Sequence, residues 1–320
     1  RREGGSCHAD VGGSTRFGLR EYPFSITPDT SFFFKSSGAQ KALNTLLMAL
    51  HMGEGFIKIT GEVGTGKTLL CRKLINSLGK DYKIAYIFNP YRDPLSLCLE
   101  VCKELGAVVP DSQMENQYQV LQALAMRMLE LNRAGKRVVI CLDEAQAMPV
   151  ATLETLRLLT NLESQKQRLA QIVIFGQPEL DEKLNHPSIR QLKQRITYSY
   201  QLPTLAGNQF DAYIRHRLLA AGHVDGQLFT SAALRTLRSH SKRVPRRINI
   251  LAHKALLCAY GDSCPRVERR HVVAAVNDTE GSPGVASKQR WKALAVGLTL
   301  SLLMILVVGG IVIYNGLLAP

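Results

Sequence analysis

The sequence feature that most constrains the fold is a glycine-rich turn between an apolar pentapeptide and a helical pattern. Residues 61–68 read GEVGTGKT, which matches the G-x4-G-K-[ST] pattern of a phosphate-binding loop. FIKIT precedes this turn at residues 56–60, and residues 67–78 have helical periodicity. Its glycines let backbone N–H groups and a helix N-terminus surround phosphate oxygens, which requires a strand before the turn and a helix after it. The turn therefore predicts a nucleotide-binding α/β domain.

This loop supplies the first candidate site residues. Lys67 is expected to reach the β- and γ-phosphates of ATP, and Thr68 is expected to bind Mg²⁺ through its hydroxyl. The residues predicted to surround the nucleotide are Gly61, Glu62, Val63, Gly64, Thr65, Gly66, Lys67, Thr68 and Leu69.

Two adjacent carboxylates follow a second apolar run. Residues 137–142 read RVVICL, which is typical of a strand buried on both faces, and Asp143 and Glu144 come directly after it. In P-loop hydrolases an acid at this place contacts Mg²⁺, and a neighbouring polar group orients the attacking water. We therefore expect Asp143 to be a metal ligand and Glu144 to be the general base. A solvated acidic turn is the alternative interpretation of the pair.

Four further polar residues stand where they could contact a γ-phosphate. Gln177 follows the next apolar run, QIVIF, so it would lie at the end of a neighbouring strand. Arg190 and Arg195 lead into a last short strand, and Arg246 opens a later helical segment. A guanidinium from a lid or a neighbouring subunit can stabilise charge on a transferring phosphoryl group. The alternatives are a loop glutamine and ordinary surface arginines.

Strand-like and helical segments alternate as far as about residue 204. Further strands are predicted at residues 83–88, 171–175 and 195–201, and helices at residues 36–52, 95–105, 117–133 and 150–163. This alternation predicts an open parallel sheet flanked by helices over residues 17–204. Only helical patterns follow, at residues 209–221, 231–239, 246–260 and 268–278, so residues 205–280 are expected to form a small all-helical lid. We assign no fold to residues 1–16.

The C-terminal end contains a long apolar segment. Residues 293–314 carry no charged side chain, and about 20 helical residues cross the hydrocarbon core of a bilayer. The linker 281–292 contains three basic residues, whereas the tail 315–320 contains none. The positive-inside rule then leaves the preceding domains in the cytoplasm. We therefore expect a single transmembrane helix; a buried core helix is the alternative.

The composition is that of a globular protein with excess positive charge. The formal net charge is +14, and residues 229–292 hold 13 basic and 4 acidic side chains. An anionic partner such as nucleic acid or a lipid surface must be considered, although no helix-turn-helix or zinc signature accompanies the charge. Seven cysteines without metal-binding spacing are typical of a reducing compartment, and Cys98 and Cys102 are expected to be buried helix thiols.

Six sequence blocks resemble a known group of ATPases. They lie at residues 17–28, 53–68, 142–146, 175–180, 190–196 and 245–251. Together they resemble the AAA+ ATPases and, more closely, the ExeA/GspA family of secretion ATPases. The first two blocks are specific to that family, whereas the DEAQ and PRR blocks also occur in related ATPases such as transposition helpers.

This resemblance implies magnesium-dependent ATP hydrolysis by a homo-oligomeric ring, for example a hexamer. Arg195 or Arg190 would act in trans, Arg246 would be the lid's nucleotide sensor, and residues 17–28 would pack near the adenine. The resemblance also implies a role for the chain at the cytoplasmic face of the inner membrane. There it would support a type IV pilus of the mannose-sensitive haemagglutinin kind, or general secretion machinery.

Two departures from the family pattern bear on these expectations. The peptidoglycan-binding domain of ExeA-type members has no counterpart before Pro320, which favours the pilus role. Residues 241–244 (SKRV) replace the family's glycine-rich approach to Pro-Arg, which leaves the lid geometry open. The alternative function is a DNA-dependent AAA+ ATPase of the transposition-helper or origin-binding type.

Overall fold

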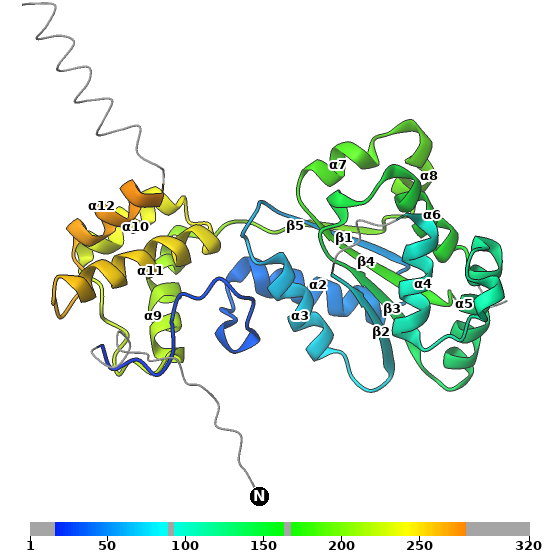
Figure 1. The fold of residues 1–320 in the computed structure, drawn as a ribbon, viewed down its shortest axis with the longest axis horizontal. Coiled ribbons are helices and arrows are strands. Elements are labelled where there is room, and N and C mark those ends of the chain that lie inside the picture. Colours follow the sequence, from blue (N-terminus) through cyan, green and yellow to red (C-terminus); the bar gives the residue numbers. More distant parts are fainter. Residues whose placement is uncertain (1–16, 89–92, 163–167, 280–320) are drawn as a thin grey trace, which may run out of the picture.

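The computed structural model describes residues 17–88, 93–162 and 168–279, which form two lobes (Figure 1). One lobe is built on a five-stranded sheet, and the other is helical. The strands are β1 (Phe56–Thr60), β2 (Tyr82–Ile87), β3 (Arg137–Leu142), β4 (Ala170–Gly176) and β5 (Tyr198–Gln201). Their order is β2-β3-β4-β1-β5, and every neighbouring pair is parallel. The predicted α/β fold with a parallel sheet is therefore confirmed.

Helices cover both faces of this sheet, which explains why its inner strands are apolar throughout. One face packs against α2 (Ser37–His51) and α3 (Lys67–Ser77). The other face packs against α4 (Pro94–Leu105), α5 (Gln117–Arg133) and α6 (Val150–Thr160). All seven residues of β4 are buried, whereas every second residue of the edge strand β5 is exposed.

The predicted thiols Cys98 and Cys102 lie on α4 and face the sheet. They are 0% and 2% exposed, and both are free. Burial in this apolar layer raises the pKa of Cys98 to about 12 and that of Cys102 to about 11. Their expected role as buried helix thiols is therefore confirmed.

Several short helices have no counterpart in the sequence prediction. They are α7 (Glu179–Leu184), α8 (Arg190–Gln194) and the 3-10 helices Thr30–Phe32, Asp111–Gln113, Ala145–Ala147, Pro187–Ile189 and Gly207–Gln209. Each spans fewer than two helical turns, so no repeat of the apolar period can be detected in it. The predicted strand at 195–201 begins only at Tyr198, because the backbone N–H groups of Arg195 and Ile196 still donate to the Leu192 and Lys193 carbonyls at the end of α8.

The helical lobe contains a segment from the beginning of the described chain. Its helices are α9 (Phe210–Ala220), α10 (Ser231–Ser241), α11 (Pro245–Gly261) and α12 (Arg269–Thr279). Phe17, Leu19 and Phe24 are buried among these helices, and the Phe24 ring meets Phe229 edge to face at 5.8 Å. Residues 17–29, which we call the N-terminal strap, therefore pack on the lid although their sequence position is next to the P-loop domain (Figure 1).

Among the residues that the structure describes, no helix is both long and apolar enough to cross a bilayer. The transmembrane helix expected at 293–314 lies outside the described residues, as do the segments 1–16, 281–292 and 315–320.

Candidate functional site

The carboxyl ends of β1, β3 and β4 lie at one edge of the sheet. The P-loop follows β1, the acidic pair Asp143 and Glu144 follows β3, and Gln177 follows β4. Because β4 lies between β3 and β1, Gln177 ends between the acidic pair and the P-loop. Lys67, Thr68, Glu144 and Gln177 line a common cavity at this edge. The structure therefore brings these predicted residues together.

The P-loop backbone closes around the Lys67 ammonium. Gly64 and Gly66 have φ angles of +79° and +101°, a region that glycine adopts without strain. Gly66 caps α3, and Lys67 is the first residue of that helix. The Lys67 Nζ donates hydrogen bonds to the carbonyl oxygens of Gly61 and Glu62, at 2.7 and 3.0 Å.

The positive charge of the Lys67 side chain could bind a phosphate. Lys67 is only 5% exposed, and this burial lowers its pKa. The carboxylates of Glu144 and Asp143 oppose the shift by favouring the charged form. Two neutral carbonyls are weaker partners for an ammonium than a triphosphate is, so a bound phosphate would be expected to replace them.

Asp143 and Thr68 bring two side-chain oxygen groups together next to the P-loop. The Thr68 hydroxyl donates to the Asp143 carboxylate, and the backbone N–H of Glu144 donates to Oδ1 of Asp143 at 3.0 Å. Burial raises the pKa of Asp143, and the hydrogen bond from Thr68 opposes this shift. A buried carboxylate beside a hydroxyl fits Mg²⁺, which prefers oxygen ligands and would supply positive charge at this point.

Glu144 is held by two side-chain amides. The Gln146 Nε2 donates to Glu144 Oε2 at 2.5 Å, and the Gln177 Nε2 donates to the same oxygen at 3.2 Å. Glu144 has a left-handed backbone with φ of 53°, which turns the chain sharply after β3. The carboxylate predicted to be the general base therefore lies beside the glutamine predicted to contact the γ-phosphate.

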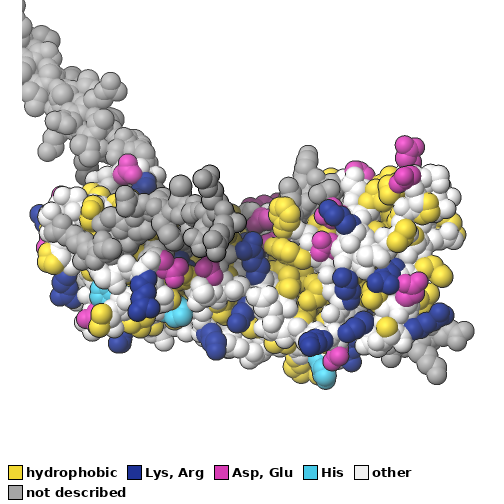
Figure 2. All heavy atoms as spheres, turned by 60° about the horizontal axis from the view of Figure 1, so that its bottom comes forward, with side chains coloured by type: hydrophobic (Ala, Val, Ile, Leu, Met, Phe, Trp, Pro, Cys, Tyr) yellow, Lys and Arg dark blue, Asp and Glu magenta, His cyan; other side chains and the backbone are white. Residues whose placement is uncertain are grey.

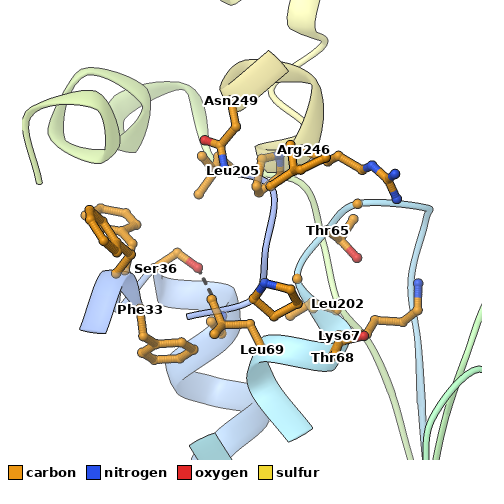
Figure 3. Close-up of a pocket in the computed structure, with 18 of the residues that line it drawn as sticks. Phe33, Ser36, Thr65, Lys67, Thr68, Leu69, Leu202, Leu205, Arg246 and Asn249 are labelled. Atoms are coloured by element: carbon orange, nitrogen blue, oxygen red, sulfur yellow. Dashed lines mark hydrogen bonds between the residues drawn. The ribbon is translucent and has the colours of Figure 1, made fainter. Parts of the chain in front are cut away.

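The lid contacts the P-loop through the first turn of α11. The backbone N–H of Arg246 donates to the Gly64 carbonyl at 3.1 Å. A Cβ at Gly64 would lie 2.4 Å from the Arg246 Cβ, so the contact requires glycine at this position. Figure 3 shows the Arg246 side chain extending from α11 across the loop, toward the side on which the Lys67 ammonium lies. The lid arginine thus reaches the same cavity as the P-loop lysine.

The N-terminal strap forms another wall of the cavity, and the lid holds it there. Arg217 of α9 donates to the carbonyl oxygens of Pro23 and Ser25, at 2.6 and 3.0 Å, and its guanidinium lies 4.4 Å from the Phe32 ring centre. The Asn249 amide on α11 also donates to the Ser25 carbonyl, at 3.3 Å. Arg217 is 5% exposed, and burial lowers its pKa. Strap residues that line the cavity are Ser25, Ile26, Thr27, Pro28 and Asp29.

Arg190 and Arg195 lie apart from this cavity. Among the described residues that line it, neither arginine is present. Arg190 is exposed at the beginning of α8, and the Arg195 guanidinium donates to the Thr160 hydroxyl at 3.4 Å. Within one chain they therefore do not join Lys67 and Glu144.

Sequence reasoning missed three residues of the site. Gln146 lies in the DEAQ block, where the sequence predicts no role for it, and it contacts both Glu144 and Gln177. Arg217 and Asn249 lie on helices of the lid, where an arginine and an asparagine are ordinary residues. Their hydrogen bonds to Gln177 and to the strap join residues that are 31 to 224 positions apart in the sequence. No local sequence pattern can predict such contacts.

The residues 241–244, which depart from the family pattern, form a left-handed turn before α11. Lys242 and Arg243 have φ angles of 50° and 61°. The Arg243 carbonyl accepts a hydrogen bond from the Leu205 N–H at 3.1 Å, which ties the turn to the segment entering the lid. Two basic residues thus adopt the backbone conformation that glycine would adopt at less cost.

We expect Lys242→Gly to raise the free energy of unfolding by up to about 1 kcal/mol. A left-handed residue with a Cβ costs about 1–2 kcal/mol, and the larger entropy of glycine in the unfolded chain offsets part of the gain. Urea unfolding of the purified protein measures the change. Lys242→Ala is the matched control, because alanine removes the charge but keeps the Cβ. Equal stabilisation by both variants would show that charge, rather than backbone strain, is responsible.

Comparison with known proteins agrees with this geometry. Residues 50–184 match the AAA domain family, and this part of the chain contains the P-loop, the acidic pair and Gln177. Fold and site together define an ATPase domain of the AAA type. The chain is related to general secretion pathway protein A of Aeromonas hydrophila, with 39% identity over 265 residues. That match covers 83% of this chain but only 48% of the relative, so the chain spans about half the length of that protein.

Solved structures share the fold at low sequence identity. The ORC2 protein of Aeropyrum pernix has a TM-score of 0.60 and 17% identity, over 80% of this chain and 71% of that chain. Cdc6p of Pyrobaculum aerophilum has a TM-score of 0.62 and 19% identity, over 77% of this chain and 67% of that chain. At these identities the likeness concerns the fold alone.

Proposed function

We propose that this chain hydrolyses ATP in a magnesium-dependent reaction. The observation that carries the proposal is the single cavity at the carboxyl ends of β1, β3 and β4, where Lys67, Thr68 and Glu144 meet above the buried Asp143. Lys67 would bind the β- and γ-phosphates, and Thr68 and Asp143 would hold the metal. Mg²⁺ bound there would neutralise charge on the phosphates.

Glu144 would accept a proton from the water that attacks the γ-phosphate. The Gln177 amide, which contacts Glu144 at 3.2 Å, would turn to a γ-phosphate oxygen when the nucleotide binds. Arg246 would contribute positive charge from the lid, since it lines the same cavity. The N-terminal strap, which lines the cavity, would pack near the adenine.

Arg195 or Arg190 would complete the site from a neighbouring subunit of a homo-oligomeric ring. Their position outside the chain's own cavity supports this part of the proposal. A guanidinium supplied in trans typically accelerates phosphoryl transfer by about 10³–10⁵-fold. Hydrolysis per subunit should therefore rise with protein concentration.

In the cell, we propose a role in assembling or driving secretion machinery at the cytoplasmic face of the inner membrane. The relationship to general secretion pathway protein A supports this class of role. The finer proposal is a counterpart of MshM in biogenesis of the mannose-sensitive haemagglutinin pilus, anchored through residues 293–314. Its support is the sequence resemblance alone.

The metal proposal predicts opposite effects of Asp143→Asn on activity and on stability. Hydrolysis by the purified full chain in Mg²⁺ should fall at least about 100-fold. Without nucleotide, the free energy of unfolding near pH 7 should rise by about 1 kcal/mol, because asparagine removes a buried charge but still accepts hydrogen bonds. Since burial raises the pKa of Asp143, this gain should shrink as the pH falls and wild-type Asp143 becomes protonated.

Asp111→Asn is the control for this variant, because Asp111 is exposed and is not among the described residues that line the cavity. It should change neither quantity. Magnesium-dependent hydrolysis at the wild-type rate by Asp143→Asn would contradict the proposed metal ligand. Chelation by EDTA should stop the wild-type reaction.

The DNA-dependent alternative has weaker support. Figure 2 shows Lys and Arg side chains spread over both lobes of one face rather than gathered in one basic patch. Hydrolysis measured with and without duplex DNA across a salt series separates the two functions. Activity that requires DNA and disappears with rising salt would favour the alternative.

A further inference from the structure

Gln146 joins two strand ends that the proposed reaction uses together. Its Nε2 donates to Glu144 Oε2 at 2.5 Å, and its Oε1 accepts the backbone N–H of Gln177 at 3.0 Å. We propose that Gln146 is a positioning residue that fixes the Glu144 carboxylate relative to the end of β4. This inference rests on the proposed ATP hydrolysis and assigns a further residue to it.

The backbone around Gln146 is well fixed. It belongs to the 3-10 helix Ala145–Ala147, which begins at the left-handed Glu144. Ala145, which precedes Gln146, and Met148, two residues after it, are 0% exposed, and the Ala147 N–H donates to the Glu144 carbonyl at 2.9 Å. The Gln146 side chain therefore starts from an anchored turn, and its two hydrogen bonds determine where its amide lies.

The end of β4 leaves room for this amide. Gly176 has no side chain, and a Cβ there would lie 3.3 Å from Gln146 Oε1 and 2.6 Å from a methyl carbon of Leu180. Glycine at this position thus allows Gln146 to approach the backbone of Gln177. The contact depends on the main chain of Gln177, so it does not use the Gln177 side chain.

Gln146 bonds to the main chain of Gln177, whereas Glu144 is bonded by the side chain of Gln177. The positioning role of Gln146 follows from this difference. The Gln177 amide also donates to Glu144 Oε2, and that bond is lost when the amide turns to a phosphate. The bond from the Gln177 N–H to Gln146 can persist, because the backbone need not move. Gln146 then keeps the Glu144 carboxylate tied to β4 while the Gln177 side chain contacts the nucleotide.

Gln146→Met tests the inference, because methionine has a similar length but forms neither hydrogen bond. We expect kcat for ATP to fall about 10- to 100-fold, because displacing a catalytic group by about 1 Å causes a loss of this size. KM for ATP should stay within threefold of wild type. Gln146→Glu keeps the acceptor but places a second carboxylate beside Glu144. Its kcat should fall at least as far.

The double variant Glu144→Gln/Gln146→Met separates positioning from structural damage. If Gln146 acts only through Glu144, the double variant should have the same residual rate as Glu144→Gln alone. A further drop in rate would overturn the inference, and so would wild-type kcat in Gln146→Met. Gln122→Glu, on the exposed face of α5, is the control and should leave hydrolysis unchanged. Absence of hydrolysis by the wild-type chain would instead reject the proposed function itself.

Discussion

Replacing Glu144 with glutamine should lower kcat for ATP hydrolysis by about 10²–10⁴-fold while nucleotide binding is retained. The glutamine side chain has nearly the same shape, and its carbonyl oxygen can still accept hydrogen bonds from Gln146 and Gln177. It cannot accept a proton from water at neutral pH. The expected result is therefore a protein that binds ATP and turns it over very slowly.

Two measurements made together test this prediction. Steady-state phosphate release at saturating ATP and Mg²⁺ gives kcat, and equilibrium binding of a non-hydrolysable analogue gives Kd. Kd should stay within about threefold of wild type, because Glu144 contacts the attacking water rather than the bound phosphates. Glu115→Gln, at an exposed position before α5, is the matched control and should leave both constants unchanged.

A kcat within twofold of wild type in Glu144→Gln would show that another group activates the water. A large loss of affinity would show instead that Glu144 holds the nucleotide. In either case the catalytic assignment would have to be given up, although the P-loop would still mark the binding site.

The parts of the site that the sequence predicted are those set by local geometry. A P-loop requires its strand and helix to be adjacent in the chain, so Gly61 to Thr68 could be placed without knowing the tertiary fold. Asp143 and Glu144 follow an apolar run that is typical of a strand buried on both faces, and the structure has that strand as β3. Parallel pairing then brings these strand ends to one edge of the sheet.

The contacts that the sequence did not predict depend either on an unusual backbone conformation or on segments that are distant in the chain. The direction of the Gln146 side chain depends on the left-handed backbone of Glu144, a conformation uncommon for glutamate. The N-terminal strap is a similar case, because Phe24 packs against Phe229 and so belongs to the lid core. A short segment of mixed polarity, interrupted by Pro23 and Pro28, carries no period that identifies its partner.

Replacing Lys67 with methionine is expected to separate the nucleotide-free stability of the protein from its response to ATP. Without nucleotide, the midpoint of thermal unfolding should stay unchanged or rise slightly. Lys67 is 5% exposed, and burial disfavours its charge, so an apolar side chain of similar length removes a desolvation cost. The variant loses the two hydrogen bonds to the Gly61 and Glu62 carbonyls, which offsets part of that gain.

The response to ATP should be lost in the same variant. A ligand at 100 times its Kd stabilises the folded state by about 2.7 kcal/mol, which in a chain of this size raises the midpoint by about 5 °C. Wild type should show this shift with ATP and Mg²⁺, and Lys67→Met should show almost none. Thermal unfolding with and without nucleotide measures both effects in one series.

Lys41→Met controls for the removal of a charge, because Lys41 is exposed on α2. It should keep the full shift with ATP. An undiminished shift in Lys67→Met would mean that ATP binds without the P-loop lysine. A nucleotide-free protein destabilised by more than about 3 kcal/mol would mean that the buried ammonium stabilises the fold more than its desolvation costs. The first outcome contradicts the assigned phosphate contact, whereas the second contradicts only the energetic argument drawn from burial.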